Sequence, residues 1–409
     1  MTSTLLPTTR AQVSGHRFLR RRVEHGLVLG DIRMIHDPLA TRSRALLFGL
    51  VAVVMISLGA GLMAWLRPAP DPGDAPILQT ADGALFVAVD TRLHPVANLA
   101  SARLIAGGAE DPARVGAGVL AEAERGVPVG IHPAPLVLAG EEVGEMAWSA
   151  CSDATGTVTV AVGEHTNPLG GHRGVLAAGD GREWLLSAEG RHELPAADSP
   201  EGRILRRALG ITAATPRWEP PAEVLTTIDE LDPYRLPAHL PTEILDTGAG
   251  HWAVLPDGVA PLRDIQAAVL ADAGVPRRTV PREELAGHPD AALELLLPAF
   301  APQLLDAAAL TVCSTDGGVS TLRSDTPPVA LSGDGVAAEF RADLPAAVAV
   351  DTGHGHHVVD VTGLRHTVPT REDLAALGLP EPVSAPWPVL RLLPEGPELS
   401  RAAALRAAY

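Results

Sequence analysis

The stretch ALLFGLVAVVMISLGAGLMAWL occupies residues 45–66 and contains no charged side chain. At about 1.5 Å per residue, a helix of this length spans roughly 33 Å, close to the ~30 Å hydrocarbon core of a bilayer. Arg42 and Arg44 precede the stretch, and Trp65 lies near its other end, where an interfacial aromatic residue is expected. The sequence therefore predicts a transmembrane helix at 45–66.

Arginine is concentrated on one side of this helix. Residues 1–44 carry eight Arg and three carboxylates and have a net charge of +5. Residues 67–409 have a net charge of −22, which gives the whole chain its net charge of −17. This asymmetry predicts a cytoplasmic N-terminus, with the bulk of the chain outside the cytoplasm. The acidic bulk also argues against nucleic acid as the main partner.

Two alternative interpretations of residues 45–66 are a cleaved signal peptide and a buried core helix. A signal peptide has a short basic start, whereas here 44 residues precede the apolar run. A core helix of this length without a polar face is unusual. The sequence favours an uncleaved single-pass anchor in the inner membrane, followed by a linker at 67–76 that contains four prolines.

The segment before the anchor, at 11–38, is expected to form a basic amphipathic helix near the inner leaflet or on a partner. Ser14 is the expected helix cap, and Pro38 is expected to end the region. Three apolar residues recur every fourth position: Leu19, Val23 and Leu27. The alternative is a purely topological role, in which the Arg residues only keep the N-terminus inside.

Beyond the linker, the chain repeats itself weakly at 77–107, 175–211, 244–274 and 348–379. Each copy reads as a short strand, a Gly-containing turn, a second strand and, after a short link, an Ala/Leu-rich helix. The second strands are LFVAV, EWLLS, HWAVL and HHVVD. A unit of ~30 residues is too small to be securely stable alone, so each should pack on its neighbours or on a central body.

Two cysteine-containing stretches lie between the repeats, MAWSACSDATGTVTVAV at 146–162 and AALTVCSTDGGVSTLRS at 308–324. Their similarity and their positions predict a pseudo-symmetric arrangement in which both stretches pair in a central sheet. Two cysteines in an oxidising compartment predict one disulfide, Cys151–Cys313. Two buried free thiols are the alternative.

The expected fold is therefore a single-pass membrane protein whose α+β exported region has four small ββα-like repeats around a central β-sheet domain. The expected boundaries are a cytoplasmic segment at 1–44, the helix at 45–66, the linker at 67–76, repeat 1 at 77–114, the first half of the central domain at 115–170, repeat 2 at 171–215, repeat 3 at 240–284, the second half of the central domain at 285–340, repeat 4 at 345–385 and a C-terminal tail at 386–409.

Motifs that carry chemistry are scarce in this chain. Every basic residue other than His is Arg, so a P-loop, which needs a Lys, is excluded. The G-x-S-x-G, H-E-x-x-H, C-x-x-C and G-x-G-x-x-G patterns are also absent from the sequence. Three groups of polar residues are candidates for a chemical site: His354, His356 and His357 as a metal cluster, Glu141, Glu142 and Glu145 as catalytic carboxylates, and His94 with Pro95 as catalytic residues. A structural role is favoured for each: a repeat strand for the three histidines, a solvated loop for the glutamates, and a turn for His94 and Pro95. We therefore assign no catalytic, cofactor-binding or metal-binding residue.

Four stretches resemble EccB, the single-pass core component of the type VII (ESX) secretion system of actinobacteria. They are VSGHRFLRRRVEHGLVLGDIRMIHDP at 13–38, RLHPVANLASARLIAG at 92–107, GVPVGIHPAP at 126–135 and WSAC at 148–151. Their order fits, and the resemblance covers essentially the whole chain. It implies four small repeats around a central domain, with Cys151 and Cys313 as the positions of the family's disulfide.

The resemblance also implies partners and a role. EccB-like proteins lie in a hexameric inner-membrane complex with the FtsK-like ATPase EccC, the membrane subunits EccD and EccE, and the mycosin protease, and their exported regions contact one another. The expected function is a structural subunit that supports export of WXG/PE/PPE-class proteins. Some family members are described as ATPases, so a hydrolase with a non-standard site is one alternative. A cell-wall-binding module is another.

Overall fold

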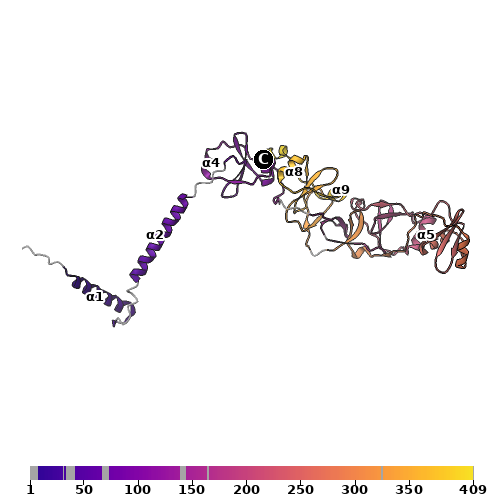
Figure 1. Ribbon diagram of the computed structural model, residues 1–409, viewed down its shortest axis with the longest axis horizontal. Coiled ribbons are helices and arrows are strands. Elements are labelled where there is room, and N and C mark those ends of the chain that lie inside the picture. Colours follow the sequence, from indigo (N-terminus) through magenta and orange to yellow (C-terminus); the bar gives the residue numbers. More distant parts are fainter. Residues whose placement is uncertain are drawn as a thin grey trace, which may run out of the picture. The chain divides into compact units, whose positions relative to one another are not determined.

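The computed structural model describes residues 8–30, 32–33, 42–66, 73–138, 144–163, 165–323 and 326–408. The chain divides into two compact units, Met1–Asp71 and Pro72–Tyr409. The first unit contains α1 (Arg10–Leu29) and α2 (Arg42–Leu66), which are the indigo and purple helices of Figure 1. The described strands all belong to the second unit.

Helix α1 begins at a capping box. The Thr9 hydroxyl accepts from the Gln12 N–H, and the Gln12 side chain accepts from the Thr9 N–H. The prediction that Ser14 caps the helix is therefore wrong. The helix begins at Arg10, the Thr9 side chain accepts from a free N–H group of its first turn, and Ser14 lies inside the helix. Gly30 ends α1 in the left-handed region, at φ 70°. Pro38, expected to end the region, lies outside the described residues.

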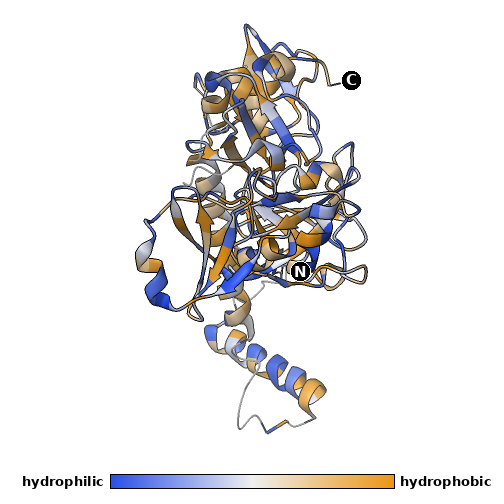
Figure 2. Ribbon diagram, turned by 90° about the vertical axis from the view of Figure 1, so that its right-hand side faces the viewer, coloured by the Kyte–Doolittle hydropathy of each residue, from blue (hydrophilic) through white to orange (hydrophobic). Residues whose placement is uncertain are grey.

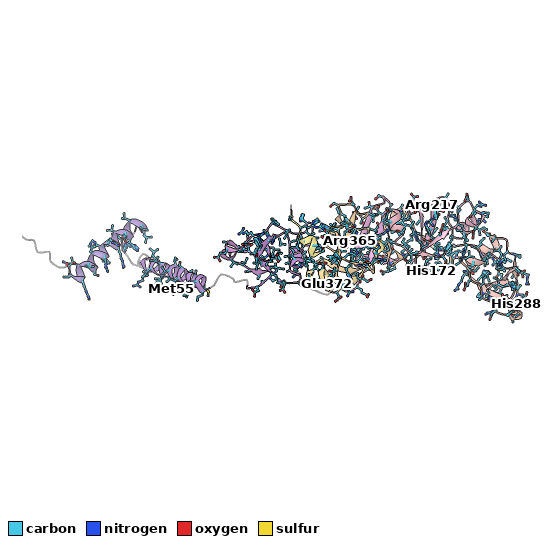
Figure 3. The ribbon with its side chains drawn as sticks, turned by 90° about the horizontal axis from the view of Figure 1, so that it is seen from above. Met55, His172, Arg217, His288, Arg365 and Glu372 are labelled. Carbon is cyan, nitrogen blue, oxygen red and sulfur yellow. A yellow bond between two sulfur atoms is a disulfide. The ribbon has the colours of Figure 1, made fainter. Side chains whose placement is uncertain are left out.

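Helix α2 contains the apolar stretch and extends it at the N-terminal end to Arg42. Within it, Arg44–Met63 has a mean hydropathy of 2.5, and no part of this span is buried against the rest of the chain. Met55, labelled in Figure 3, is 65% exposed. Among the described residues, α2 is the one helix that is long and apolar enough to cross a membrane.

The second unit has mixed α and β structure, as predicted, and includes four small sheets. Sheet 1 consists of β1 (Ile77–Gln79), β2 (Leu85–Val89), β3 (Arg92–Val96) and β4 (Ala113–Arg114), with α3 (Leu99–Ala106). Sheet 2 consists of β8 (Arg173–Gly179), β9 (Arg182–Leu186), β10 (Arg191–Leu194), β11 (Glu230–Leu231) and β16 (Gln303–Leu304), with α5 (Pro200–Ala208). Sheet 3 consists of β12 (Glu243–Asp246), β13 (His251–Leu255), β14 (Gly258–Leu262) and β15 (Arg277–Thr279), with α7 (Asp264–Asp272). Sheet 4 consists of β21 (Val348–Asp351), β22 (His356–Val359), β23 (Arg365–Val368) and β24 (Val383–Ser384), with α8 (Arg371–Leu377).

The predicted ββα unit is therefore incomplete. Each small sheet has three antiparallel strands before its helix, and a short strand after the helix closes sheets 1, 3 and 4 by pairing parallel to their first strand. The third strands were missed because two of them contain a proline, Pro95 and Pro261, which cannot donate to a ladder. The closing strands span two or three residues, too short for a periodic signal.

Sheet 2 departs from the other three. Its strand β16 pairs parallel to β8, with Gln303 opposite Arg173. Residues 303–304 were expected in the second half of the central domain, at 285–340, so this part of the predicted boundary is wrong. The pairing joins segments that are far apart in sequence, and local composition carries no signal for it.

The central sheet has the strand order β19-β20-β6-β5-β17-β18-β7. Its strands are β5 (Trp148–Ser152), β6 (Val158–Val162), β7 (Thr166–Pro168), β17 (Val312–Thr315), β18 (Gly318–Leu322), β19 (Val329–Ala330) and β20 (Glu339–Ala342). The two cysteine-containing stretches meet at the centre, where β5 and β17 pair antiparallel with Cys151 opposite Cys313. The remaining short helices are α4 (Ala117–Glu122), α6 (Ala222–Leu225), α9 (Trp387–Leu390) and α10 (Arg401–Ala404), with 3-10 turns at Arg282–Gly287 and Ala307–Ala309.

Three hydrophobic cores join the five sheets. The central sheet shares one core with sheets 2 and 4, to which Trp148, Trp184 and Val350 contribute. Sheets 2 and 3 share a second core, in which α5 lies against α7, and sheets 1 and 4 share a third, in which α3 lies against α8. Sheets 2 and 4 are therefore buried on both faces, which explains their near-continuous apolar strands such as RGVLAAG and VAVD.

The end of the chain runs from sheet 4 to sheet 1, and we call residues 394–408 the C-terminal strap. It pairs with β23 through the Leu399 N–H and the Thr367 carbonyl, 2.9 Å apart. It then packs α10 on α3, and Ala407 forms a bridge with Val129. In Figure 1 the C-terminus accordingly lies beside the purple segments of sheet 1. The expected C-terminal tail at 386–409 thus includes the strap, which packs against sheets 1 and 4.

Candidate assembly surfaces

Helix α1 combines basic and apolar side chains that are almost all exposed. It carries five Arg and one carboxylate, Glu24, which pairs with Arg20 at 3.1 Å. The apolar side chains of Leu19, Val23 and Leu27 are 60%, 60% and 82% exposed. Figure 2 shows hydrophilic and hydrophobic residues side by side along this helix. An exposed helix with this composition is typical of a segment that binds a membrane surface or another protein.

The centre of the second unit is fixed by a disulfide between Cys151 and Cys313, the two positions to which the resemblance assigned it. Both residues are fully buried, on a sheet face that also holds hydroxyl side chains. On this face the Thr315 hydroxyl lies 2.7 Å from those of Ser149 and Ser320. The bond closes a chain segment of 162 positions, so it links the two halves of the central sheet covalently.

A histidine recurs at one position of the third strand in sheets 1, 2 and 4. The Nδ1–H groups of His94, His192 and His366 donate to the carbonyls of Val127, Asp232 and Pro397, at 2.9, 2.8 and 2.8 Å. Each carbonyl belongs to the segment that follows the repeat and runs parallel to the third strand. Each histidine therefore fixes the outgoing chain to its sheet, and sheet 3 has Ala260 at this position.

An arginine precedes two of these histidines and adds a second attachment. Arg191 pairs with Glu230 at 3.0 Å, and Arg365 pairs with Glu395 at 3.2 Å. Both guanidinium groups also lie over tryptophan rings, at 4.4 Å for Trp184 and 5.1 Å for Trp387. Arg365, labelled in Figure 3, has only 7% of its side chain exposed. The roles of Arg191 and Arg365 were not predicted, although an Arg-His dipeptide occurs at both 191–192 and 365–366 in the sequence.

We expect Gly396→Ala to destabilise sheet 4. A Cβ at this position would lie 2.5 Å from Cε1 of His366, whose fully buried ring is held by its bond to Pro397. Overpacking of this kind typically costs ~1–3 kcal/mol of the free energy of unfolding. Chemical denaturation measures the loss. Gly287→Ala is the matched control, because nothing lies within 4 Å of the Cβ it would add. Equal stability of the two variants would contradict the prediction.

Sheet 4 should lose stability in mild acid. Burial lowers the pKa of His366, and burial together with the nearby Arg365 lowers the pKa of His357. The unfolded chain therefore binds more protons than the folded chain below about pH 6.5. The stabilisation is complete above that pH and is lost as the pH falls towards the lowered values. The free energy of unfolding should fall less between pH 7.5 and pH 5 in His366→Gln than in the control His239→Gln, whose substituted side chain is exposed. Chemical denaturation at the two pH values measures this change.

The remaining polar residues weighed from the sequence do not converge on a chemical site. His354 lies in a turn before β22, so the placement of all three histidines in a repeat strand is wrong for His354. His356 begins β22 next to Asp351, and the His357 ring stacks on Trp387 with centroids 5.3 Å apart. Within the described ranges, no group of three or more His, Cys, Asp or Glu side chains is placed to hold a metal ion.

Two other expectations concern residues 94–95 and 141–145. His94 and Pro95 were expected in a turn but lie within β3, so this interpretation is corrected. The turn was predicted because proline disfavours strands, and the strand forms because Pro95 lies where a ladder donor is not needed. Glu141 and Glu142 lie outside the described residues, and Glu145 lies in an irregular segment before β5.

The family model for the type VII secretion system ESX-1 transport TM domain B matches residues 5–316 and 346–408. The chain belongs to the EccB family. The resemblance seen in the sequence is thereby confirmed. This EccB-family chain is 30% identical to the ESX-1 secretion system ATPase EccB1 of Mycobacterium tuberculosis, over 97% of this chain and 94% of that protein. It is 31% identical to the ESX-3 secretion system ATPase EccB3 of Mycolicibacterium smegmatis, over 98% and 90%.

Solved structures show the same architecture. A chain of the intact ESX-5 inner membrane complex matches with a TM-score of 0.67 and 28% identity, covering 99% of this EccB-family chain and 96% of that chain. A chain of the EccB3 dimer from the ESX-3 core complex matches with a TM-score of 0.65 and 26% identity, covering 81% and 100%. The first match covers nearly the whole chain and therefore includes residues of both units.

Proposed function

We propose that this EccB-family chain is a structural and assembly subunit of a type VII secretion inner-membrane complex, and that it supports export of WXG/PE/PPE-class proteins. The observation that carries the proposal is the full-length match to a chain of the intact ESX-5 inner membrane complex. The family model matches residues 5–316 and 346–408, which include α1, α2 and strands of all five sheets. A structural subunit needs surfaces that contact the membrane and other subunits, and it needs no catalytic site.

The proposed topology has α2 crossing the inner membrane once, with α1 in the cytoplasm and the sheets on the other side. The eight Arg among residues 1–44 support this orientation through the positive-inside rule. The disulfide supports it as well, because such bonds persist in oxidising compartments. Alkaline phosphatase, which is active only outside the cytoplasm, should be active when fused after Tyr409 and inactive when fused before Met1. The opposite pattern would reject the topology.

The proposed partners are EccC-like, EccD-like and EccE-like membrane subunits, a mycosin protease and other copies of this chain. The matches to an inner membrane complex and to an EccB3 dimer support both kinds of association. Affinity purification of the tagged full chain from detergent-extracted membranes, followed by mass spectrometry, tests this directly. Recovery of the other subunits is the expected result. Recovery of the chain alone under conditions that preserve the complex would reject the proposal.

ATP hydrolysis is the second candidate, because the relatives EccB1 and EccB3 are named as secretion system ATPases. This chain contains no Lys, so any nucleotide site in it must differ from a P-loop. Turnover by the purified full chain that co-elutes with the protein through every column, and that a single substitution abolishes, would favour this function. Turnover that separates from the protein would exclude it.

A further inference from the structure

Three arginines of α1 share one face. At 100° per residue, Arg10, Arg17 and Arg21 fall within an arc of about 40° around the helix axis. They line a hollow of about 650 Å³ together with Thr8, Val13, Ser14 and Phe18. The lining contains no carboxylate, and among the described residues neither Arg10 nor Arg17 makes an ion pair. We call this surface the three-arginine face.

The apolar stripe of α1 lies on the other side of the helix. Leu19, Val23 and Leu27 occupy an arc of about 80° whose centre is about 140° from the centre of the three-arginine face. All three side chains are more than half exposed. One flat surface therefore cannot bind the stripe and the three-arginine face at the same time.

The anchor decides which side meets lipid. Only 12 residues separate Leu29 from Arg42, so the end of α1 lies within about 40 Å of the start of α2. A tethered amphipathic helix places its apolar stripe in the membrane interface. Arg20 and Arg22 flank the stripe on either side and are placed to meet lipid phosphates. The three-arginine face then points away from the bilayer.

We propose that the three-arginine face binds an acidic segment of a neighbouring protein subunit at the cytoplasmic membrane surface. This inference rests on the proposed function, which puts α1 in the cytoplasm next to other subunits. Arg10 and Arg17, which make no ion pair among the described residues, lie about 10 Å apart along the axis, a spacing suited to two carboxylates of one peptide. Guanidinium groups bind carboxylates through paired hydrogen bonds, and charge complementarity favours this occupant over an apolar one.

Site-specific photo-crosslinking in cells tests the proposal on the full chain in its native complex. A benzophenone amino acid replaces Ser14, inside the three-arginine face, or Val23, in the stripe. We expect position 14 to crosslink an acidic stretch of a co-purifying subunit, mapped by mass spectrometry, and position 23 to give lipid adducts. Arg10→Glu with Arg17→Glu should lower the yield at position 14 at least about tenfold, because the change replaces two attractive charges with two that repel the carboxylates of the partner.

The matched control is Arg20→Glu with Arg22→Glu, which makes the same charge change off the face and should leave the position 14 crosslink intact. Lipid adducts at position 14, an equal loss in both double variants, or no loss in either would overturn the proposal. Co-purification of the other subunits and an intact Cys151–Cys313 bond show that each variant folds and assembles. If the wild-type chain itself recovers no other subunits, the proposed function fails; if it does and position 14 behaves otherwise, only this inference fails.

Discussion

Replacing both cysteines by alanine should lower the free energy of unfolding of the second unit, Pro72–Tyr409, by up to about 5 kcal/mol. The estimate follows from loop-closure entropy, because the Cys151–Cys313 bond spans 162 positions. A typical domain is stable by only ~5–15 kcal/mol, so the loss is a large share of the total. Limited proteolysis should then cut first in the central sheet, where β5 and β17 lose their covalent link. Chemical denaturation of the full chain in detergent measures the change.

Reductant provides the control for this prediction. The wild-type chain treated with dithiothreitol should fall to the stability of the Cys151→Ala/Cys313→Ala variant, whereas the variant should not respond to reductant. Alanine is chosen because both positions are fully buried, where a serine hydroxyl would need a partner. A double variant as stable as the wild type would show that pairing and packing of the central sheet, without the bond, hold it together.

Truncating Leu399 should weaken the packing of sheet 1 against sheet 4. Its side chain is fully buried in the core shared by sheets 1 and 4, and its N–H pairs with the Thr367 carbonyl. Leu399→Ala should therefore cost ~2–5 kcal/mol. Deletion of 395–409 should cost more, because it also removes α10 from α3 and the bridge between Ala407 and Val129.

Hydrogen exchange shows where this stability is lost. We expect faster exchange in α3 and at residues 128–130 in both variants, with little change in the core of sheets 2 and 3, to which the strap contributes nothing among the described residues. Leu405→Ala is the matched control, since its side chain is 39% exposed and the change should have a small effect. Uniform loss of protection across all five sheets would contradict a local role for the strap.

The candidate surfaces were predicted to different extents. The sequence showed that α1 is both basic and apolar, and it showed the spacing of Leu19, Val23 and Leu27. The cap at Thr9 was not predicted, because the hydroxyl that accepts from the first free backbone N–H groups depends on where the helix begins. The histidines that fix each outgoing segment were missed because their acceptors, such as Pro397 for His366, lie about thirty positions away. The Gly396 contact with the same ring has no local signal for the same reason.

The sequence by itself determined the long apolar helix, the separation of charge around it and the identity of the disulfide partners. An uncharged stretch that matches the bilayer thickness has few other stable environments, and two cysteines allow one intramolecular pairing. Only the tertiary structure decided the third strands, the insertion of β16 into sheet 2 and the path of the strap. These features depend on hydrogen bonds and cores formed between distant segments, and the energies of those contacts are not encoded in local periodicity.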